Sequence, residues 1–264
     1  MKEMSSEWHL RVFRKSLLKQ AKLNAIRAFL PDLEGKVCLD LGGDNGIISY
    51  FLREGGGIWH SADLSDHAVG SIRALVHTNV FKTGGSALPF PDGSLDLVVI
   101  IDFLEHIPHD QEFIHELGRV MKKSGLLIIN VPYLKKRSVI RWVKKTLGLS
   151  DERHGHLRPG YTMGGLASLL GGRFTIVAQR TYSRFFTELL DVIINLGYGT
   201  SAEDTAQPGK GLLLTENELK NKRRTFRMYS LLYPFIWCFS ALDILLFFTD
   251  GHKLILKAIR SEAF

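Results

Sequence analysis

The chain has 264 residues, of which 45% are hydrophobic and 23% charged. These values exclude a disordered or low-complexity protein and leave room for one large α/β domain with an insertion. The formal net charge of +7 at pH 7 favours contact with anions, which include phospholipid headgroups, nucleic acids and acidic substrates.

Cysteine usage and the start of the chain bear on the compartment. Cys38 and Cys238 are far apart, and each lies in an apolar run. The first residues do not combine a basic start, a continuous apolar stretch and a cleavage site. Both features predict a reduced, cytoplasmic protein.

The first half of the chain predicts helices that alternate with strands. Apolar residues recur at helical spacing from Ser5 to Leu30, which predicts an amphipathic helix. The apolar run 36–40 ends in glycines and predicts a buried strand that leads into a tight turn. A helix over 47–53, a strand over 58–63 and a helix over 66–77 are expected to follow.

The second half continues this alternation. The nearly unbroken apolar run 95–102 predicts a central strand that is covered on both faces. We expect a helix over 110–121 and then strands over 125–131, 173–180 and 252–260. The pattern predicts a doubly wound α/β sheet. About seventy residues separate the last two strands, so a helical insertion is expected between them.

These elements divide the chain into four predicted parts. They are an amphipathic N-terminal helix over 1–30, a core over 31–182, a helical, apolar insertion over 183–250 and the last strand of the core over 251–264. Within the insertion, 197–211 is poor in hydrophobic residues and predicts a mobile loop.

The glycine-rich segment after the first strand predicts a ligand-binding turn. Asp40 ends the strand, and Gly42-Gly43-Asp44-Asn45-Gly46 leads into a helix, so that backbone N–H groups face a ligand. The G-x-G-x-x-G order is absent, and Asp44 would repel a pyrophosphate. A sulfonium cofactor fits better, because Asp40 can serve its ammonium group through the loop and Asp63 can accept both ribose hydroxyls.

Four motifs in this order resemble the class I S-adenosylmethionine-dependent methyltransferases of the small-molecule, type 11-like family. They are Val-Cys-Leu-Asp-Leu-Gly-Gly-Asp-Asn-Gly, Ala-Asp-Leu-Ser, Ala-Leu-Pro-Phe-Pro-Asp-Gly-Ser-Leu-Asp-Leu-Val and Leu-Glu-His-Ile. The resemblance implies S-adenosyl-L-methionine as cofactor and a seven-stranded, mostly parallel, Rossmann-like sheet whose last strand is antiparallel. The residues expected to bind the cofactor are Asp40, Gly42, Gly43, Gly46, Asp63, Leu64, Gly85 and Ser86.

Two positions depart from the family pattern. Asp44 stands where the family has its middle glycine, which alters the loop without abolishing it. The family often has an acidic residue that binds the adenine amino group before Leu-Pro-Phe, whereas this chain has Gly84-Gly85-Ser86-Ala87. Backbone groups are therefore expected to bind the adenine.

Candidate catalytic residues follow the strands at the edge where open α/β sheets bind ligands. Asp102, Glu105 and His106 are predicted to be catalytic, with His106 as a general base or as a group that orients the acceptor. Tyr133, His154 and His156 are predicted to contact the acceptor, and the alternative for the histidines is a solvated loop.

A divalent metal is an alternative at this cluster. A similar Glu-x-x-Glu-His arrangement supports a metal in ubiquinone-pathway O-methyltransferases and small-RNA 2′-O-methyltransferases, and one helical turn would then bring Asp102, Glu105 and His106 together. Leu-Glu-His-Ile also occurs in metal-free relatives. The metal is therefore not favoured, and no metal ligand is assigned.

Two stretches are expected near the mouth of the site. The first combines apolar and basic side chains, and the second is rich in aromatic side chains. The segment 135–149 has the composition of an interfacial basic helix. The segment 229–248 is mostly apolar, but Pro234 and Asp243 argue against a transmembrane span. We expect a peripheral position at the inner face of an anionic membrane. The alternatives are that both stretches pack against the domain or that the second forms a homodimer contact.

The sequence thus predicts an enzyme that transfers a methyl group to a hydroxyl or carbon of a small, apolar or lipid-linked acceptor. An RNA methyltransferase is one alternative, which the basic surface fits although no RNA-binding sheet motif, KH loop or zinc module is present. A catalytically silent binding protein with the same cofactor fold is the other.

Overall fold

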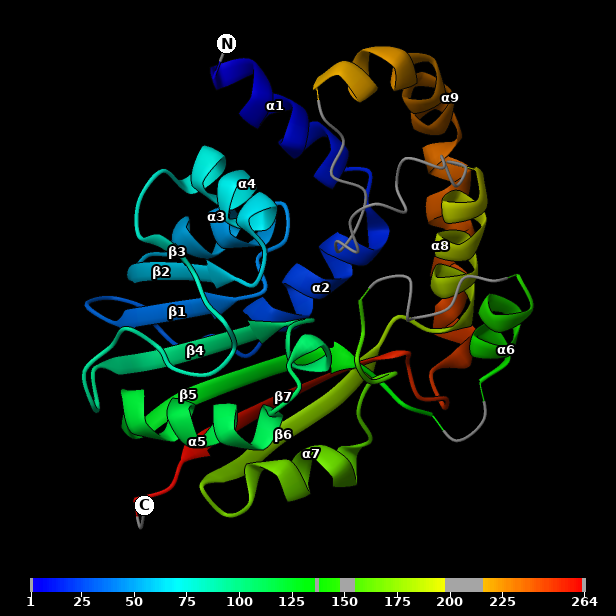
Figure 1. Ribbon diagram of the computed structural model, residues 1–264. Coiled ribbons are helices and arrows are strands. Elements are labelled where there is room, and N and C mark those ends of the chain that lie inside the picture. Colours follow the sequence, from blue (N-terminus) through cyan, green and yellow to red (C-terminus); the bar gives the residue numbers. More distant parts are fainter. Residues whose placement is uncertain (1, 136–137, 148–154, 198–215, 263–264) are drawn as a thin grey trace.

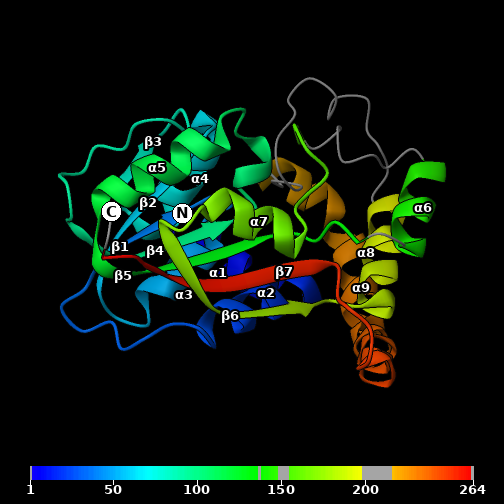
Figure 2. The same cartoon turned by 90° about the horizontal axis from the view of Figure 1, so that it is seen from below.

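A seven-stranded sheet runs through the computed structural model, which describes residues 2–135, 138–147, 155–197 and 216–262 (Figures 1 and 2). The strands are β1 (Val37–Leu41), β2 (Ile58–Asp63), β3 (Val80–Lys82), β4 (Leu95–Ile101), β5 (Met121–Pro132), β6 (Phe174–Tyr182) and β7 (Lys253–Arg260). Their order is β3-β2-β1-β4-β5-β7-β6. β1 to β5 pair in parallel, and β7 runs antiparallel to β5 and β6. The predicted fold class is confirmed.

Helices cover both faces of this sheet. They are α1 (Lys2–Phe13), α2 (Leu17–Arg27), α3 (Ile47–Arg53), α4 (Asp66–Val76), α5 (Asp110–Val120), α6 (Val139–Thr146), α7 (Met163–Leu170), α8 (Phe185–Gly197) and α9 (Glu216–Ala241). Two 3-10 helices, η1 (Leu104–His106) and η4 (Leu242–Leu246), complete the described elements used below. Residues of α2 and α3 pack on one face, and residues of α5 and α7 pack on the other.

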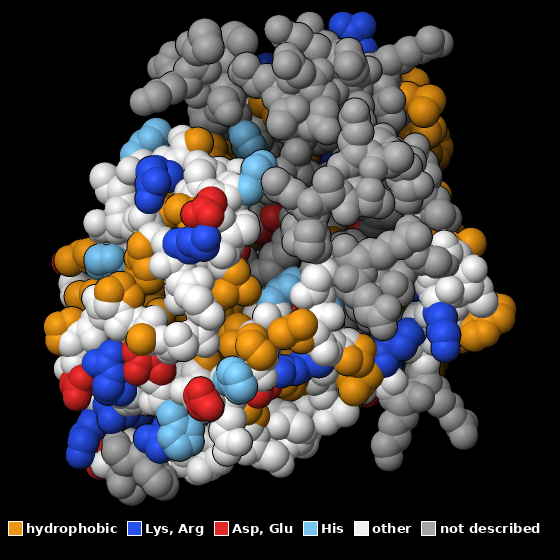
Figure 3. Space-filling view, in the orientation of Figure 1, with side chains coloured by type: hydrophobic (Ala, Val, Ile, Leu, Met, Phe, Trp, Pro, Cys, Tyr) orange, Lys and Arg blue, Asp and Glu red, His pale blue; other side chains and the backbone are white. Residues whose placement is uncertain are grey.

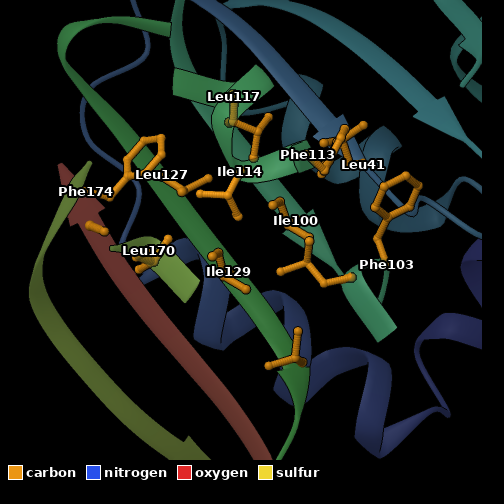
Figure 4. Packing of buried hydrophobic residues seen from close by; sticks show 14 of the residues in the cluster. Leu41, Ile100, Phe103, Phe113, Ile114, Leu117, Leu127, Ile129, Leu170 and Phe174 are labelled. Atoms are coloured by element: carbon orange, nitrogen blue, oxygen red, sulfur yellow. The ribbon is translucent and has the colours of Figure 1, made fainter. Parts of the chain in front are cut away.

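The central strands are apolar because both of their faces are buried. Along β4, Leu97 and Val99 point into the core beneath α2 and α3, whereas Val98 and Ile100 point into the core beneath α5 and α7. Figure 4 shows the second core, where α5 side chains, among them Phe113, lie against the strands. A continuous apolar run is the sequence signature of such a strand.

The prediction of one continuous N-terminal helix is wrong. The chain breaks between α1 and α2, where Ser16 has an extended backbone. Gln20 Nε2 donates hydrogen bonds to the carbonyls of Phe13 at 3.3 Å and Arg14 at 3.1 Å. These bonds satisfy carbonyl groups at the end of α1, so the break is stabilised by one side chain of the next helix.

The helical insertion lies between β6 and β7, as predicted. β6 ends and β7 begins at the edge where the parallel strands also end, so the inserted helices leave from this carboxyl edge. Both views show α6, α8 and α9 together beyond it (Figures 1 and 2). The loop predicted over 197–211 lies outside the described residues, apart from Gly197.

Asp243 connects the end of the insertion to its beginning. Its carboxylate accepts hydrogen bonds from the backbone N–H groups of Arg184, Phe186 and Thr187 at 2.9, 2.8 and 3.4 Å. Asp243 therefore caps the start of α8. This acidic residue within an apolar segment has a structural partner inside the domain.

The predicted basic helix over 135–149 is observed as α6. It begins after Ser138, whose Oγ accepts a hydrogen bond from the N–H of Arg141 at 3.1 Å. Residues 136–137 and 148–154 lie outside the described part of the chain. α6 packs on α8 through Lys144, which pairs with buried Glu188 at 3.3 Å.

Candidate active site

The turn between β1 and α3 requires its glycines. Gly42 and Gly46 have φ angles of 87° and 80°, a region that other residues rarely adopt. A Cβ at Gly46 would lie 2.7 Å from Cα of Ile72, and one at Gly43 would lie 2.5 Å from Oγ of Ser49. The backbone of the turn therefore packs closely against its support, and the N–H groups of Gly42 and Gly46 donate within the protein, to the carbonyls of Ala62 at 3.0 Å and Gly43 at 2.8 Å.

Asp40 supports this turn from below. Its fully buried carboxylate accepts hydrogen bonds from Ser49 Oγ and Ser61 Oγ, both at 2.6 Å, and lies 3.5 Å from Arg53 Nη1. Burial raises the pKa of this carboxyl, although the two hydroxyls and the guanidinium act in the opposite direction. Asp40 thus joins β1, β2 and α3, and its effect on the cofactor through the turn stays a prediction.

Asp63 ends β2 beside the turn. Its Oδ2 accepts a hydrogen bond from the N–H of Asp44 at 3.2 Å, and its Oδ1 accepts one from the N–H of Leu64 at 2.7 Å. These bonds fix the carboxylate at the carboxyl edge, where it can accept ribose hydroxyls. The side chain of Asp44 lies 3.5 Å from Lys19 Nζ, so a cation of α2 faces the middle of the turn.

The loop after β3 connects the cofactor turn to the catalytic candidates. Gly85 is buried with a φ angle of 73°, and its N–H donates to Oγ1 of Thr83 at 3.2 Å. A Cβ at Gly85 would lie 3.1 Å from the side chain of Ile107, and Ser86 is exposed. The predicted adenine loop is thus adjacent to the chain that follows η1.

η1 places Glu105 and His106 directly after β4. Glu105 is fully buried, and its carbonyl accepts a hydrogen bond from the N–H of Leu157 at 2.9 Å. His106 Nδ1 lies 3.0 Å from the carbonyl oxygen of Gly155. Because a carbonyl only accepts, this contact assigns the proton to Nδ1 and the lone pair to Nε2.

His156 joins these two residues. The rings of His106 and His156 meet edge to face, with centroids 4.7 Å apart. His156 is therefore close to the catalytic candidates, although its predicted contact with an acceptor stays a prediction. His154 lies outside the described residues.

Asp102 does not come together with Glu105 and His106. Its φ angle of 43° turns the chain into η1. Its Oδ2 pairs with Lys22 Nζ of α2, and its Oδ1 accepts a hydrogen bond from Asn130 Nδ2 at 3.3 Å and lies 3.6 Å from Lys253 Nζ. The expectation that one helical turn would assemble the three side chains is wrong, because two lysines and an amide hold the carboxylate elsewhere.

This polar network extends to Tyr182, whose hydroxyl donates to Oδ1 of Asn130 at 2.5 Å. Burial and the nearby charge of Asp102 raise the pKa of Tyr182 well above its ordinary value. Burial alone would lower the pKa of Lys253, but Asp102 and Glu188 raise it, so Lys253 stays a cation. Sequence reasoning missed Lys22, Tyr182 and Lys253, since no local pattern distinguishes them.

Tyr133 lies just beyond β5 at the same edge. Its N–H donates to the carbonyl of His252 at 2.9 Å, and its backbone forms a bridge with Tyr161. Burial raises the pKa of Tyr133, and the carboxylate of Asp250 adds to this effect. The half-buried ring is a neutral group, and its predicted contact with an acceptor stays a prediction.

The fold and the turn define a Rossmann-like α/β protein with a nucleoside-cofactor site. Residues 39–129 match the family model described as a methyltransferase domain. A protein of Mycobacterium tuberculosis named as a probable S-adenosylmethionine-dependent methyltransferase is 33% identical over 73 residues, which are 27% of this chain and 27% of that protein. The ubiquinone/menaquinone biosynthesis C-methyltransferase UbiE of Stenotrophomonas maltophilia is 34% identical over 101 residues, which are 34% of this chain and 40% of that protein. The match thus spans about a quarter of the first relative's length.

Solved structures share the fold. A methyltransferase of Methanosarcina mazei has a TM-score of 0.53 and 16% identity, with 89% of this chain and 96% of that chain covered. The cyclase SpnF has a TM-score of 0.52 and 18% identity, with 90% and 79% covered. Residues 39–129 are thus similar to the methyltransferase domain of S-adenosylmethionine-dependent methyltransferases, whose cofactor is S-adenosylmethionine. The cyclase is a reminder that the fold alone does not set the reaction.

Proposed function

We propose that this protein transfers a methyl group from S-adenosylmethionine to a hydroxyl or carbon of a small, apolar or lipid-linked acceptor, and that it meets the acceptor at the inner, anionic surface of a membrane. The observation that carries the acceptor is an exposed apolar surface beyond the carboxyl edge of the sheet. We call it the apolar helical surface. Its members are Val139, Trp142 and Leu147, Ile193, Met228, Leu231, Leu232, Phe235 and Trp237, Leu242, Ile244, Leu245, Phe247 and Phe248.

The exposure of this surface is unusual for the molecule. Outside this surface, the described residues include three other large exposed hydrophobic side chains, which are Ile58, Leu157 and Val177. Phe235 is 74% exposed and Phe247 is 76% exposed. Figure 3 shows hydrophobic side chains at the right-hand edge, with basic side chains beside those over α6. Contiguous apolar patches of this kind mark interaction sites in soluble proteins.

Basic residues accompany the apolar ones on α6. Arg141 and Lys145 share this helix with Trp142, which is 66% exposed. A helix of this composition binds anionic lipid through both apolar burial and charge attraction. The mouth of the site is reached from the same edge, since α6 follows β5.

The long apolar helix favours a peripheral position. Phe226–Leu246 is long and apolar enough to cross a membrane by length and composition, and none of the window is buried. Both of its ends are fastened to the domain: Tyr229 donates to the carbonyl of Lys15 at 2.6 Å, and Asp243 caps α8. A helix that is held at both ends supports a position along the membrane surface rather than across it.

Methyl transfer itself needs little beyond orientation, because the cofactor carries an activated methyl group on a positive sulfur. In this proposal the turn and Asp63 hold the donor, and His106 faces the acceptor at the end of β4. His106 can accept a proton at Nε2, because its Nδ1 is bound to Gly155. The match to the C-methyltransferase covers 40% of that protein, and the support for an apolar acceptor is the exposed apolar helical surface of this chain.

A labelled methyl donor tests the reaction. The protein is incubated with S-adenosylmethionine that carries a radiolabelled methyl group and, separately, with lipid, aqueous and RNA fractions of its source cells. We expect label in the lipid fraction and none with Gly46→Val, whose Cβ would meet Ile72. Label in RNA would establish the RNA methyltransferase instead. Cofactor binding without transfer to any fraction would support the silent binding protein.

A vesicle assay tests the membrane separately. We expect the protein to sediment with phosphatidylglycerol vesicles, less with phosphatidylcholine vesicles, and less at high salt. The double variant Phe247→Ser, Phe248→Ser should lose most of this binding. Val177→Ser is the matched control, since Val177 is 48% exposed on β6. Equal sedimentation with both lipids, or no effect of the double variant, would contradict the proposal.

A further inference from the structure

We infer that Glu105, His106 and His156 form a binding site for a divalent first-row transition-metal ion. One ligand atom from each residue lies within 4.8 Å of the ligand atoms of the other two. Ligands that bind one ion at about 2.0–2.2 Å lie at most about 4.4 Å apart. Adjustments of a few tenths of an ångström would therefore bring the three atoms into a single coordination sphere.

The hydrogen bonding of His106 supports this assignment. Its Nδ1–H donates to the carbonyl oxygen of Gly155 at 3.0 Å. Histidines that bind metals commonly donate their other ring N–H to a backbone carbonyl, which fixes the tautomer and the direction of the ring. The lone pair of Nε2 then lies on the side of the ring away from Gly155.

Hydrogen bonds from the residues that follow His156 hold it beside η1. The N–H of Leu157 donates to the carbonyl of Glu105 at 2.9 Å, and Nη1 of Arg158 donates to the carbonyl of Leu104 at 3.1 Å. The hydroxyl of Tyr161 reaches the same carbonyl of Leu104 at 3.2 Å. The third ligand is thus held by hydrogen bonds to two carbonyls of η1, and it replaces Asp102, which is bound to Lys22 and Asn130.

The donor set indicates which ions would bind. Two imidazoles and one carboxylate suit Mn²⁺, Fe²⁺, Co²⁺ or Zn²⁺, whereas Mg²⁺ and Ca²⁺ prefer oxygen ligands. Three protein ligands leave coordination positions for water or for an oxygen of a second molecule. Because Ile107 packs next to Gly85, the site lies beside the predicted adenine loop. The metal site does not depend on methyl transfer, and while an ion occupies Nε2 of His106 that atom does not accept a proton.

Cobalt(II) is the probe, because its visible absorption reports imidazole and carboxylate ligands directly. The full chain, freed of any histidine tag, is titrated with Co²⁺. We expect visible bands that saturate at one equivalent and persist in a large excess of Mg²⁺. His106→Gln and His156→Gln should each weaken binding by at least about tenfold, since even a lost outer-shell partner of a ligand costs about 10–100-fold. His109→Gln is the matched control, because His109 follows η1 closely in the chain and its side chain is 72% exposed.

Binding of S-adenosylmethionine is measured on every variant to show that it is folded. No saturable Co²⁺ band in the wild-type protein, or bands unchanged in both variants, would overturn the metal site and leave the proposed reaction standing. Conversely, Co²⁺ binding that depends on His106 and His156, without methyl transfer to any fraction, would overturn the reaction and leave the metal site standing.

Discussion

The sheet core and the apolar helical surface are both formed by large hydrophobic side chains, which are buried in the core and exposed on the surface. In the core, Phe103 and Phe113 are fully buried and strand residues point into packed layers on both faces. In the helices beyond the carboxyl edge, Phe235, Phe247 and Phe248 are each more than two-thirds exposed. The core therefore stabilises the fold, whereas the second set would contribute free energy only on being covered by a membrane or a partner, as proposed above.

The comparison predicts very different effects for two phenylalanines. Phe113→Ala should lower the free energy of unfolding by about 3–5 kcal/mol, because it removes a fully buried ring and leaves a cavity. Phe235→Ala should change it by less than about 0.5 kcal/mol, because that ring is 74% exposed. Urea unfolding in the absence of lipid measures both.

The same pair separates stability from binding. Phe235→Ala is expected to weaken vesicle sedimentation, whereas the effect of Phe113→Ala on sedimentation should follow only its unfolded fraction. A large loss of stability in Phe235→Ala would show that α9 is packed in solution, and the two regions would then no longer differ as described.

How far the sequence predicts this molecule depends on which contacts decide each element. β4 and β5 are recognisable because burial on both faces leaves a continuous apolar run. β3 has three residues, Val80–Lys82, at the edge of the sheet, and so short a strand has no pattern of its own. The break before α2 depends on the side chain of Gln20, which periodicity does not register.

The candidate site divides in the same way. The turn could be located from the sequence because its glycines lie within five consecutive residues, and the position of Asp63 because it ends a recognisable strand. The partners of Asp102 could not, since Lys22 and Lys253 come from α2 and β7 and meet only in the folded sheet. His156 lies beside Glu105 because the N–H of the next residue, Leu157, donates to the carbonyl of Glu105 across about fifty residues, and no spacing rule predicts this contact.

His252 makes the junction between the two regions sensitive to pH. Burial lowers the pKa of His252 from 6.5 to about 4, and nearby Lys135 and Lys144 add to this effect against Glu188. Between pH 4 and pH 6.5, His252 is therefore protonated in the unfolded chain and neutral in the folded chain. Stability is therefore full above about pH 6.5 and should fall by up to about 1.4 kcal/mol per unit as the pH drops toward 4.

Urea unfolding at pH 5 and pH 7.5 checks this sign. His252→Gln should remove most of the loss between the two pH values, because glutamine does not titrate. Protonation should also loosen α6, since His252 Nδ1 lies 3.5 Å from Oγ of Ser138. An equal loss in the variant would assign the pH dependence to other groups.

A smaller effect is expected where the insertion closes on itself. Asp243→Ala removes the acceptor of three backbone N–H groups at the start of α8 and should cost about 1–2 kcal/mol. Hydrogen exchange should become faster at Phe186 and Thr187 and stay unchanged in β4. Asp250→Ala is the control, and accelerated exchange throughout the sheet would mean that core and insertion unfold as one unit.

The smallest effect concerns Asp44, which links the cofactor turn to α2. Asp44→Gly removes the backbone strain of a non-glycine residue at a φ angle of 52°. It also raises the conformational entropy of the unfolded chain and removes a partly exposed ion pair with Lys19. These effects oppose one another, so the free energy of unfolding should change by less than about 1 kcal/mol. Glycine retains the backbone N–H that donates to Asp63, so the affinity for S-adenosylmethionine, measured by calorimetry, should change by less than about threefold, or about 0.6 kcal/mol. A larger fall would make the pair with Lys19 part of the cofactor site. α2 would then contribute directly to cofactor binding through Lys19. It would belong to the ligand-binding part of the molecule as well as to the core.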